Sequence, residues 1–227
     1  QDTKQRMKKI FVLFVLAITT LGGIAHAQVK GTDSVTETFS LKNGGHSWTH
    51  RYDEGIGQTS IVGDRMHMEN FTLDEWIETH CSDFVEPTND FEMYANVSKG
   101  LTLGNCSVGI IFNSKLYEDM GGDPTSYDAF FVENEEACIG HFQNGRITNR
   151  IMAPLAKSVF ATRLKGSTSE FSIGISYEFG RVDFKINDVV IMSTYTVITS
   201  QTVGFILGPS TEVAVFDSVT LTKKQGK

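Results

Sequence analysis

The sequence predicts an all-β protein, and three observations support an antiparallel sandwich or barrel. Apolar and polar residues alternate with a period of two in many short runs. Turn-forming dipeptides separate these runs at short spacing. Strand-like runs of this kind continue almost from end to end of the chain. Many short alternating strands with regular turns are typical of sandwiches and barrels.

Each alternating run is expected to form one strand with a single apolar face, because successive side chains of a strand point to opposite sides. In chain order the apolar members of these runs are Phe91, Met93, Ala95 and Val97; Val108, Ile110 and Phe112; Phe171, Ile173, Ile175 and Tyr177; Val182, Phe184 and Ile186; Val203, Phe205 and Leu207; and finally Val213, Val215, Phe216, Val219 and Leu221. These faces predict the core.

Turn signals fix where the strands end. Asn144-Gly145 is a strong hairpin dipeptide because both residues tolerate positive φ. Phe179-Gly180-Arg181 and Asn187-Asp188 flank a short strand over residues 182–186, and Gly208-Pro209-Ser210 separates the last two strands. The chain contains no internal repeat, low-complexity tract or Pro/Ser-rich linker, which predicts a single domain.

One segment fits two local structures. Residues 72–75 have the spacing of a helix capping box, which would place Leu73, Trp76 and Ile77 on one helical face. The following residues up to Cys81 also alternate as a strand would. We expect a strand or an irregular loop here.

Residues 7–27 have the three-part pattern of a secretory signal peptide. Lys8 and Lys9 form a short positive region, residues 10–18 are almost wholly apolar, and Ala25-His26-Ala27 is a small-x-small cleavage site. A membrane-spanning helix needs about 20 apolar residues, more than this stretch supplies. The sequence therefore predicts an exported protein, periplasmic or secreted, with no inserted membrane helix.

Cleavage after Ala27 leaves residues 28–227 as the single predicted domain, preceded by upstream residues and signal peptide over 1–27. Removing residues 1–27 takes away four basic residues and one acidic residue, which changes the net charge from −7 to −10. Nucleic-acid binding requires clustered Lys and Arg opposite phosphates. The acidic balance therefore argues against nucleic acid and against anionic lipid surfaces as partners.

The order of the segments resembles the concanavalin A-like lectin/glucanase superfamily, especially the laminin-G-like and unknown-function domains of secreted bacterial proteins. There, a strand ending in phenylalanine-x-isoleucine-asparagine-glycine precedes a hairpin, and here Phe184 to Asn187 are followed by Asp188. The superfamily's closing strand, phenylalanine-aspartate-asparagine/serine-hydrophobic, corresponds to residues 216–219. The resemblance covers roughly residues 35–223. It implies a two-sheet antiparallel jelly-roll whose concave face or edge loops often bind glycans.

Hydrolases of this superfamily carry a run of acidic residues on one strand, and this chain has no such run. A retaining glycosidase needs two carboxyl groups about 5–5.5 Å apart. Glu133 and Glu135 have a suitable spacing, but residues 133–136 lie between two alternating runs and are predicted as a solvated hairpin tip. We therefore expect a non-catalytic protein, with a glycoside hydrolase of unfamiliar residues as the alternative.

No resident cofactor is predicted. The histidines, which include His80 and His141, lack a metal-ligand spacing. Residues 117–128 form an acidic, glycine-containing loop without EF-hand spacing, which leaves calcium as the alternative. The cysteines at 81, 106 and 138 are interpreted as buried structural residues, or as one disulfide and a remaining thiol.

A glycan site needs aromatic faces together with a few polar groups that fix hydroxyls. The candidates are Trp48, Trp76, Tyr127 and His141, so the predicted partner is a glycan or polysaccharide. Alternatively the two tryptophans fill the ends of the sandwich, because aromatic residues dominate protein cores. A protein-interaction or envelope-structural domain is the third functional class.

Overall fold

The computed structural model describes residues 34–37, 39, 48, 52–53, 55–81, 90–99, 107–116, 124–133, 136–155, 169–198, 202–209 and 213–224. All of them fall in one compact unit, Asp33–Lys227. The predicted export signal, residues 7–27, lies outside the described residues. Within the described ranges, no helix is long and apolar enough to span a membrane.

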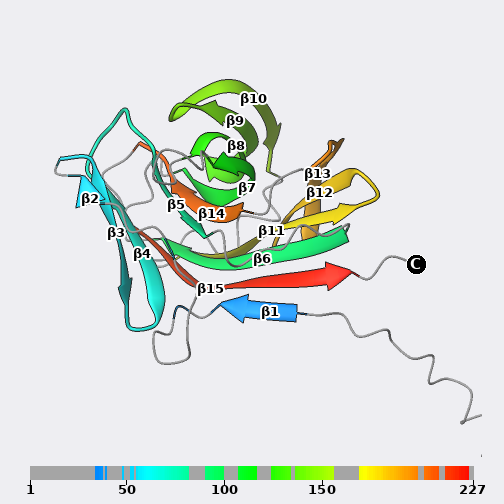
Figure 1. Ribbon diagram of the computed structural model, residues 1–227, viewed down its shortest axis with the longest axis horizontal. Coiled ribbons are helices and arrows are strands. Elements are labelled where there is room, and N and C mark those ends of the chain that lie inside the picture. Colours follow the sequence, from blue (N-terminus) through cyan, green and yellow to red (C-terminus); the bar gives the residue numbers. More distant parts are fainter. Residues whose placement is uncertain are drawn as a thin grey trace, which may run out of the picture. The chain divides into compact units, whose positions relative to one another are not determined.

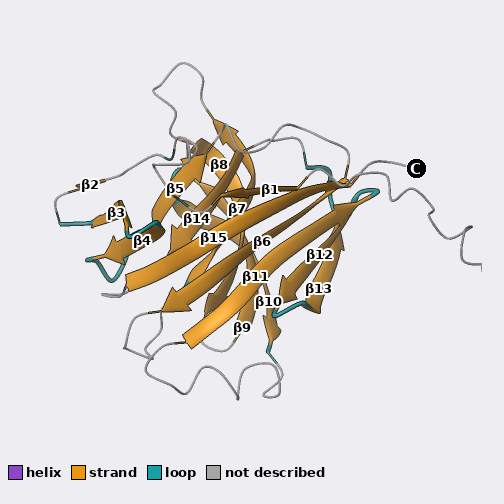
Figure 2. Cartoon of the chain, turned by 90° about the horizontal axis from the view of Figure 1, so that it is seen from below, coloured by secondary structure: helices purple, strands orange, loops and turns teal. Residues whose placement is uncertain are grey.

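In the described residues, nine strands form one antiparallel sheet, sheet A (Figures 1 and 2). Its order is β13 (Val189–Tyr195), β12 (Arg181–Ile186), β11 (Ser169–Glu178), β6 (Asp90–Lys99), β15 (Val213–Lys224), β4 (Arg65–Asn70), β3 (Gly57–Val62) and β2 (Tyr52–Asp53). The long strand β15 pairs with β4 at its start and with β1 (Ser34–Glu37) toward its end.

Six described strands form the second antiparallel sheet, sheet B. Its order is β10 (Arg146–Pro154), β9 (Glu136–Gln143), β8 (Pro124–Glu133), β7 (Val108–Leu116), β14 (Thr202–Leu207) and β5 (Ile77–Cys81). The strands β8 to β10 curve strongly (Figure 1). The fold is therefore an all-β, two-sheet antiparallel sandwich, as the sequence predicts.

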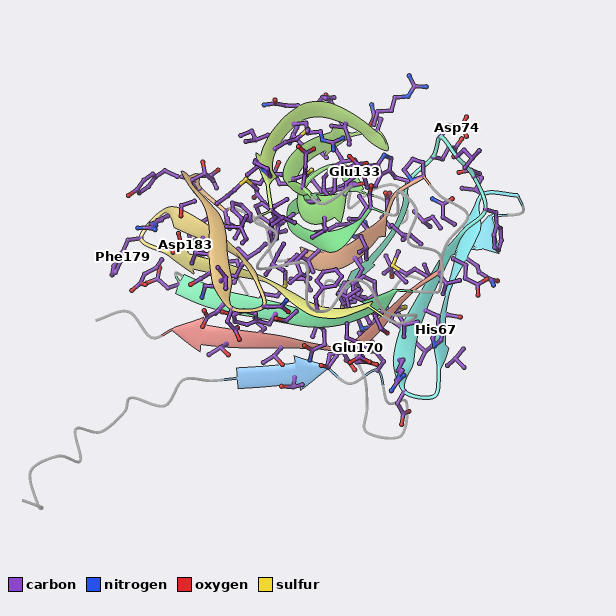
Figure 3. The ribbon with its side chains drawn as sticks, turned by 180° about the vertical axis from the view of Figure 1, so that it is seen from behind. His67, Asp74, Glu133, Glu170, Phe179 and Asp183 are labelled. Carbon is purple, nitrogen blue, oxygen red and sulfur yellow. The ribbon has the colours of Figure 1, made fainter. Side chains whose placement is uncertain are left out.

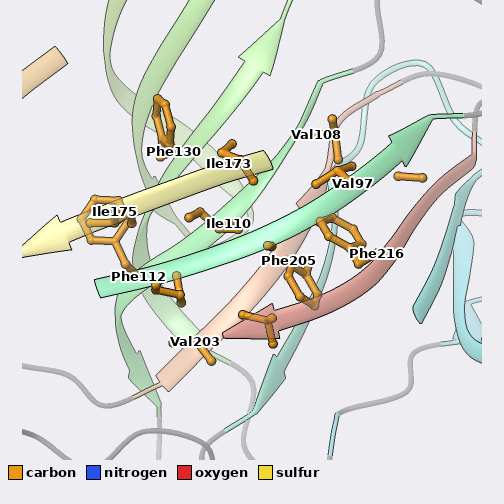
Figure 4. Close-up of a cluster of buried hydrophobic side chains, with 14 of the residues drawn as sticks. Val97, Val108, Ile110, Phe112, Phe130, Ile173, Ile175, Val203, Phe205 and Phe216 are labelled. Atoms are coloured by element: carbon orange, nitrogen blue, oxygen red, sulfur yellow. The ribbon is translucent and has the colours of Figure 1, made fainter. Parts of the chain in front are cut away.

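The main core lies between the two sheets (Figure 4). The rings of Phe205 on β14 and Phe216 on β15 stack across it, with centroids 3.8 Å apart. The predicted apolar faces of the alternating runs fill this core: Met93, Ala95 and Val97; Val108, Ile110 and Phe112; Ile173 and Ile175; Val182, Phe184 and Ile186; and Phe205 and Leu207. Burial of these alternating residues holds the sheets together through the hydrophobic effect.

The start of β15 differs from the sequence prediction. Val213 and Val215 are predicted on the apolar face, but both are only half-buried, whereas Phe216 and Val219 are buried. The register with β6 shifts after Phe216 and leaves Asp217 as an extra residue. Such a bulge changes which side chains face the core, so the valines before it point away.

The hairpin turns adopt the predicted conformations. Asn144-Gly145 has φ values of 50° and 73°, and Asn187-Asp188 has values of 50° and 65°. Positive φ at both central residues is the conformation that fits the twist of a two-residue hairpin. Asp188 therefore takes the place of the superfamily's glycine without disturbing the turn.

The segment over residues 72–81 resolves as a bend followed by strand β5. Thr72 Oγ1 accepts a hydrogen bond from the Glu75 backbone N–H at 3.2 Å, so the capping interaction forms without a helix. Asn70 ties the bend down, because its side chain donates to the carbonyls of Glu75 and Gly208. The expectation of a loop or strand is confirmed.

Candidate functional site

Two of the predicted ligand-binding residues lie in the interior. Trp48 is 6 % exposed and stacks on Phe205 with ring centroids 5.0 Å apart. Tyr127 is 1 % exposed, stacks on Phe142 at 4.7 Å, and donates its hydroxyl hydrogen to Glu78 at 2.7 Å. Both rings therefore pack against other residues of the protein. For Trp48 this agrees with the alternative interpretation, in which the tryptophans fill the ends of the sandwich.

The other two predicted residues reach the surface. Trp76 is half-buried just before β5, and its ring meets the edges of Phe131 and Phe142 at 5.1 Å each. His141 has a side chain that is 47 % exposed, and its Nδ1 lies 2.7 Å from Asp128 Oδ1. The structure thus brings Trp76 and Tyr127 into one aromatic cluster. It places Trp48 in the other cluster.

That second cluster covers the side of sheet B that faces away from sheet A, here called the sheet B outer face. Its residues are Ile111, Tyr127, Ala129, Phe131, Cys138, Phe142 and Ile206, with Trp76 and Ile147 packed against them. Gly140 leaves room for the rings, since a Cβ there would lie 2.9 Å from Phe142 and 3.0 Å from Phe131. The guanidinium of Arg150 lies 5.5 Å from the Phe131 ring centroid.

Glu133 ends β8 at the edge of this face, and its environment differs from the prediction. The sequence predicts a solvated hairpin tip, but only 18 % of the Glu133 side chain is exposed. Its Oε1 accepts a hydrogen bond from Ser107 at 2.6 Å, and its Oε2 pairs with Arg150. The ion pair with Arg150 on β10 and the hydrogen bond from Ser107, just before β7, therefore keep the Glu133 carboxylate largely buried. Glu135 lies outside the described residues.

Burial also changes the titratable groups of the sheet B outer face. The pKa of His80 falls to about 4 because the interior disfavours the charged imidazolium. Burial raises the pKa of the Cys138 thiol to about 12, and the nearby charge of Glu136 adds to this rise. Cys138 is a free thiol and Cys81 is also buried, whereas Cys106 lies outside the described residues. His80 and Cys138 are therefore shielded from water.

A pocket of about 360 Å³ opens on the opposite side of the sandwich, on the side of sheet A that faces away from sheet B. This sheet A pocket is lined by Ser176, Glu178, Phe179, Arg181, Asp183 and Tyr195. Phe179 is 77 % exposed and Tyr195 is 78 % exposed. Two rings at the surface thus border a pocket whose other lining side chains are polar.

Local strand chemistry explains why these side chains meet. Val182 and Phe184 enter the core, so the alternation of β12 turns Arg181 and Asp183 outward. The turn to β12 is formed by Phe179-Gly180, with φ values of 50° and 81°. The Phe179 backbone N–H donates to Asp90 Oδ1 at 3.0 Å, which anchors the turn to β6. Figure 3 shows Phe179 and Asp183 at the same end of the sheet.

A small polar network organises the pocket. Asp183 Oδ1 accepts hydrogen bonds from Arg181 Nε at 2.8 Å and from Ser193 Oγ at 2.6 Å. The Ser193 hydrogen bond, followed by the hydrogen bond and charge of Arg181, lowers the pKa of Asp183 below its ordinary range. An ionised carboxylate and its paired guanidinium, in one pocket with two exposed rings, can hold a neutral, hydroxyl-rich molecule.

These pocket residues are not among the predicted site residues, although the turn beside them is predicted from the sequence. Arg181 and Asp183 have the i, i+2 spacing that places two side chains on one polar strand face. Phe179 occupies a turn, where an aromatic ring has no core to enter. These two signals together could have indicated the pocket.

No group of three or more His, Cys, Asp or Glu residues suited to a metal ion occurs among the described residues. Of the acidic loop considered for calcium, residues 117–123 lie outside the described part of the chain. Asp128 is described, and its Oδ2 accepts a hydrogen bond from Asn113 at 2.8 Å. The prediction about calcium therefore stays a prediction.

Comparison with solved structures finds sandwiches of the same architecture. The carbohydrate-binding module CBM66 from Bacillus subtilis matches with a TM-score of 0.52 and 14 % identity, covering 75 % of this chain and 91 % of that one. A Bacillus licheniformis β-glucanase matches with a TM-score of 0.52 and 11 % identity, covering 87 % and 100 %. The exoplasmic/lumenal domain of VIP36, with bound Ca²⁺ and Man3GlcNAc, has a TM-score of 0.54 and 12 % identity, covering 87 % and 92 %.

Neither the scan against protein-family models nor the search of curated proteins finds a match. At these identities the structural matches define the fold alone. The chain has the concanavalin A-like jelly-roll sandwich fold, which is the architecture that the order of its segments indicates.

Proposed function

We propose that this chain is an exported, non-catalytic sandwich module that binds carbohydrate through the sheet A pocket. The observation that carries the proposal is the position of Phe179 and Tyr195, two exposed rings that border an organised polar pocket. Sugar rings have apolar C–H faces that pack on aromatic rings, and hydroxyls that bond to charged or polar side chains. The pocket offers both kinds of contact.

The structural matches support a carbohydrate ligand. One of them is itself a carbohydrate-binding module, and another is a domain with bound Man3GlcNAc. A site on sheet A differs from the four residues that the sequence suggests. Trp76 and His141 retain exposed surface and are the competing contacts that the sequence suggests, so variants of both belong in the test.

A non-catalytic role is supported by the environment of Glu133. Both of its carboxylate oxygens are engaged, one by Ser107 and the other by Arg150. The neighbouring rings of Tyr127, Phe131 and Phe142 are buried where a hydrolase on this face would need an open cleft. Release of reducing sugar that Glu133→Gln abolishes would instead establish a glycoside hydrolase.

Export is part of the proposal, and it rests on the signal pattern of residues 7–27. Expression of the full chain in a bacterial host should give a product that begins at Gln28 outside the cytoplasm. Mass spectrometry of periplasmic and medium fractions measures this. An uncleaved product retained with the cytoplasmic membrane would overturn the assignment.

A glycan array tests the binding function directly. Phe179→Ala and Tyr195→Ala should each remove most of the binding, because each deletes one aromatic border of the pocket. Phe71→Ala is the matched control, since Phe71 is an exposed ring elsewhere that is 46 % accessible. Binding that survives both pocket variants, or that is lost in Trp76→Ala or His141→Ala, would contradict the proposed site. Stable co-purification with a surface protein, without glycan binding, would favour a protein-interaction or envelope-structural domain.

A further inference from the structure

The outer side of sheet A carries a third aromatic ring beside the pocket. Tyr94 on β6 lies directly opposite Gly174 on β11, and Gly174 lies opposite Lys185 on β12. A Cβ on Gly174 would come within 2.3 Å of the Tyr94 ring. Glycine at position 174 therefore leaves room for the ring beside β11, and the Tyr94 side chain is half-buried, so part of it remains exposed.

The Tyr94 hydroxyl belongs to a polar network on the outer side of sheet A. The hydroxyl donates to Glu92 Oε1 at 2.8 Å and accepts from Lys185 Nζ at 2.8 Å. Lys185 Nζ lies 5.4 Å from the ring centroid, which places the ammonium beyond the hydroxyl rather than above the ring. The surroundings of Tyr94 are therefore built by three strands of the sheet, β6, β11 and β12.

This ring and the sheet A pocket belong to one continuous surface. Ser176 lines the pocket, lies two residues from Gly174 on the same strand, and is opposite both Glu92 and Asp183. Tyr195 and Tyr94 are four residues apart along the strands, about 13 Å, and three strands apart across the sheet, about 14 Å. A single sugar ring cannot reach from one aromatic group to the other.

The charges on this surface favour a neutral ligand. Arg181 is already bonded to Asp183, and Lys185 is already bonded to Glu92. Both cations are thus neutralised by carboxylates, and the whole chain carries a net charge of −7. A uronic-acid or sulfated glycan would meet net repulsion here.

We propose that the sheet A pocket and the Tyr94 ring form the two ends of one groove for a neutral, linear oligosaccharide. This inference rests on the proposed carbohydrate-binding function and deepens it. One sugar unit stacks between Phe179 and Tyr195, and a later unit of the same chain stacks on Tyr94. Gly174 acts as a positioning residue, because a Cβ at this position would displace the Tyr94 ring.

The test is isothermal titration calorimetry with ladders of cello-, xylo-, manno- and fructo-oligosaccharides, from mono- to hexasaccharide. Wild-type affinity should rise with chain length until the ligand spans both rings. Tyr94→Ala should weaken the longest ligands about tenfold while leaving the shortest binding ligands unchanged. Tyr195→Ala should weaken every length. Gly174→Ala should reproduce the Tyr94→Ala profile because the added Cβ lifts the ring.

Tyr94→Phe is the matched control, since it retains the ring and should keep the affinity for long ligands within about twofold. Thermal melts check that every variant is folded. If Tyr195→Ala weakens binding but Tyr94→Ala leaves the long ligands unchanged, the extended groove is wrong and the proposed function stands. If no ladder binds, or if binding ignores both variants, the groove and the proposed sheet A site both fail.

Discussion

The two outer faces of this sandwich use aromatic residues in opposite ways. On the sheet B outer face, Tyr127, Phe131 and Phe142 are buried in one cluster with Trp76 against it. On sheet A, Phe179 and Tyr195 project into solvent around a polar pocket. Aromatic rings that contact each other stabilise the fold, whereas rings that contact only solvent remain available to a ligand.

The same difference governs the charged groups. On sheet B, burial lowers the pKa of His80 and raises that of Cys138, so both groups are neutral. On sheet A, hydrogen bonds to Ser193 and Arg181 lower the pKa of Asp183, which is therefore ionised. The buried His80 and Cys138 of sheet B are thus neutral, whereas Asp183 in the sheet A pocket is charged. Substitutions on the two faces should separate stability from binding.

The largest expected effect is on sheet B. Phe142→Ala should lower the free energy of unfolding by about 3–5 kcal/mol, because it opens a cavity among the rings of Trp76, Tyr127 and Phe131. Urea denaturation measures the change. Phe142→Leu, which retains part of the volume, should cost less. A loss below about 1 kcal/mol for the alanine variant would show that this cluster is not tightly packed.

Acid should weaken the protein through His80. Its folded pKa of about 4 lies below the ordinary value of 6.5, so between these values the unfolded chain binds a proton that the folded chain does not. The contribution of His80 is complete above pH 6.5 and decreases by about 3 kcal/mol as the pH falls to 4. Urea denaturation at several pH values across this range measures the change, and the free energy of unfolding should depend less on pH in His80→Gln than in the wild type. An unchanged pH slope in that variant would mean that another group is responsible.

A smaller effect is expected at Tyr127. Tyr127→Phe removes the hydroxyl that donates to the Glu78 carboxylate at 2.7 Å, yet leaves the ring stacked on Phe142. Hydrogen bonds to charged groups contribute about 1.5–3 kcal/mol, so unfolding should become easier by an amount in this range. Glycan affinity should not change. If Tyr127→Phe lost glycan affinity without losing stability, Tyr127 would have to be part of the binding site.

The smallest effect on stability is expected on sheet A. Tyr195→Ala should change the free energy of unfolding by no more than about 0.5 kcal/mol, because the residue is exposed at the end of an edge strand. The same variant should lose most of its glycan binding. Chemical denaturation beside the binding assay measures both quantities. A large loss of stability would place Tyr195 among the structural residues.

The strands could be predicted from the sequence, but the exposure of individual aromatic residues could not. Alternation located β6, β7, β11 and β12, because a strand with one buried face repeats every two residues. It misplaced Val213 and Val215, because the single extra residue at Asp217 changes the phase and leaves no mark in composition.

Exposure depends on which strands become neighbours. Tyr127 lies on β8, between β7 and β9, where its ring meets Phe142. Tyr195 ends β13, which is an edge strand of sheet A. Both are tyrosines close to loops in the sequence, and only the pairing of strands distinguishes the buried ring from the exposed one. The site residues were therefore predicted from residue type alone, whereas the position of the pocket depends on which strands pair.

An NMR titration of the isotope-labelled protein with the oligosaccharide that binds best on the array tests the choice of face most directly. The backbone amides of residues 176–183 and 193–195, together with that of Tyr94, should shift as ligand is added. Those of Trp76, Tyr127 and His141 should remain in place. Shifts centred on these three residues, with the amides of β11 to β13 unchanged, would contradict binding on sheet A.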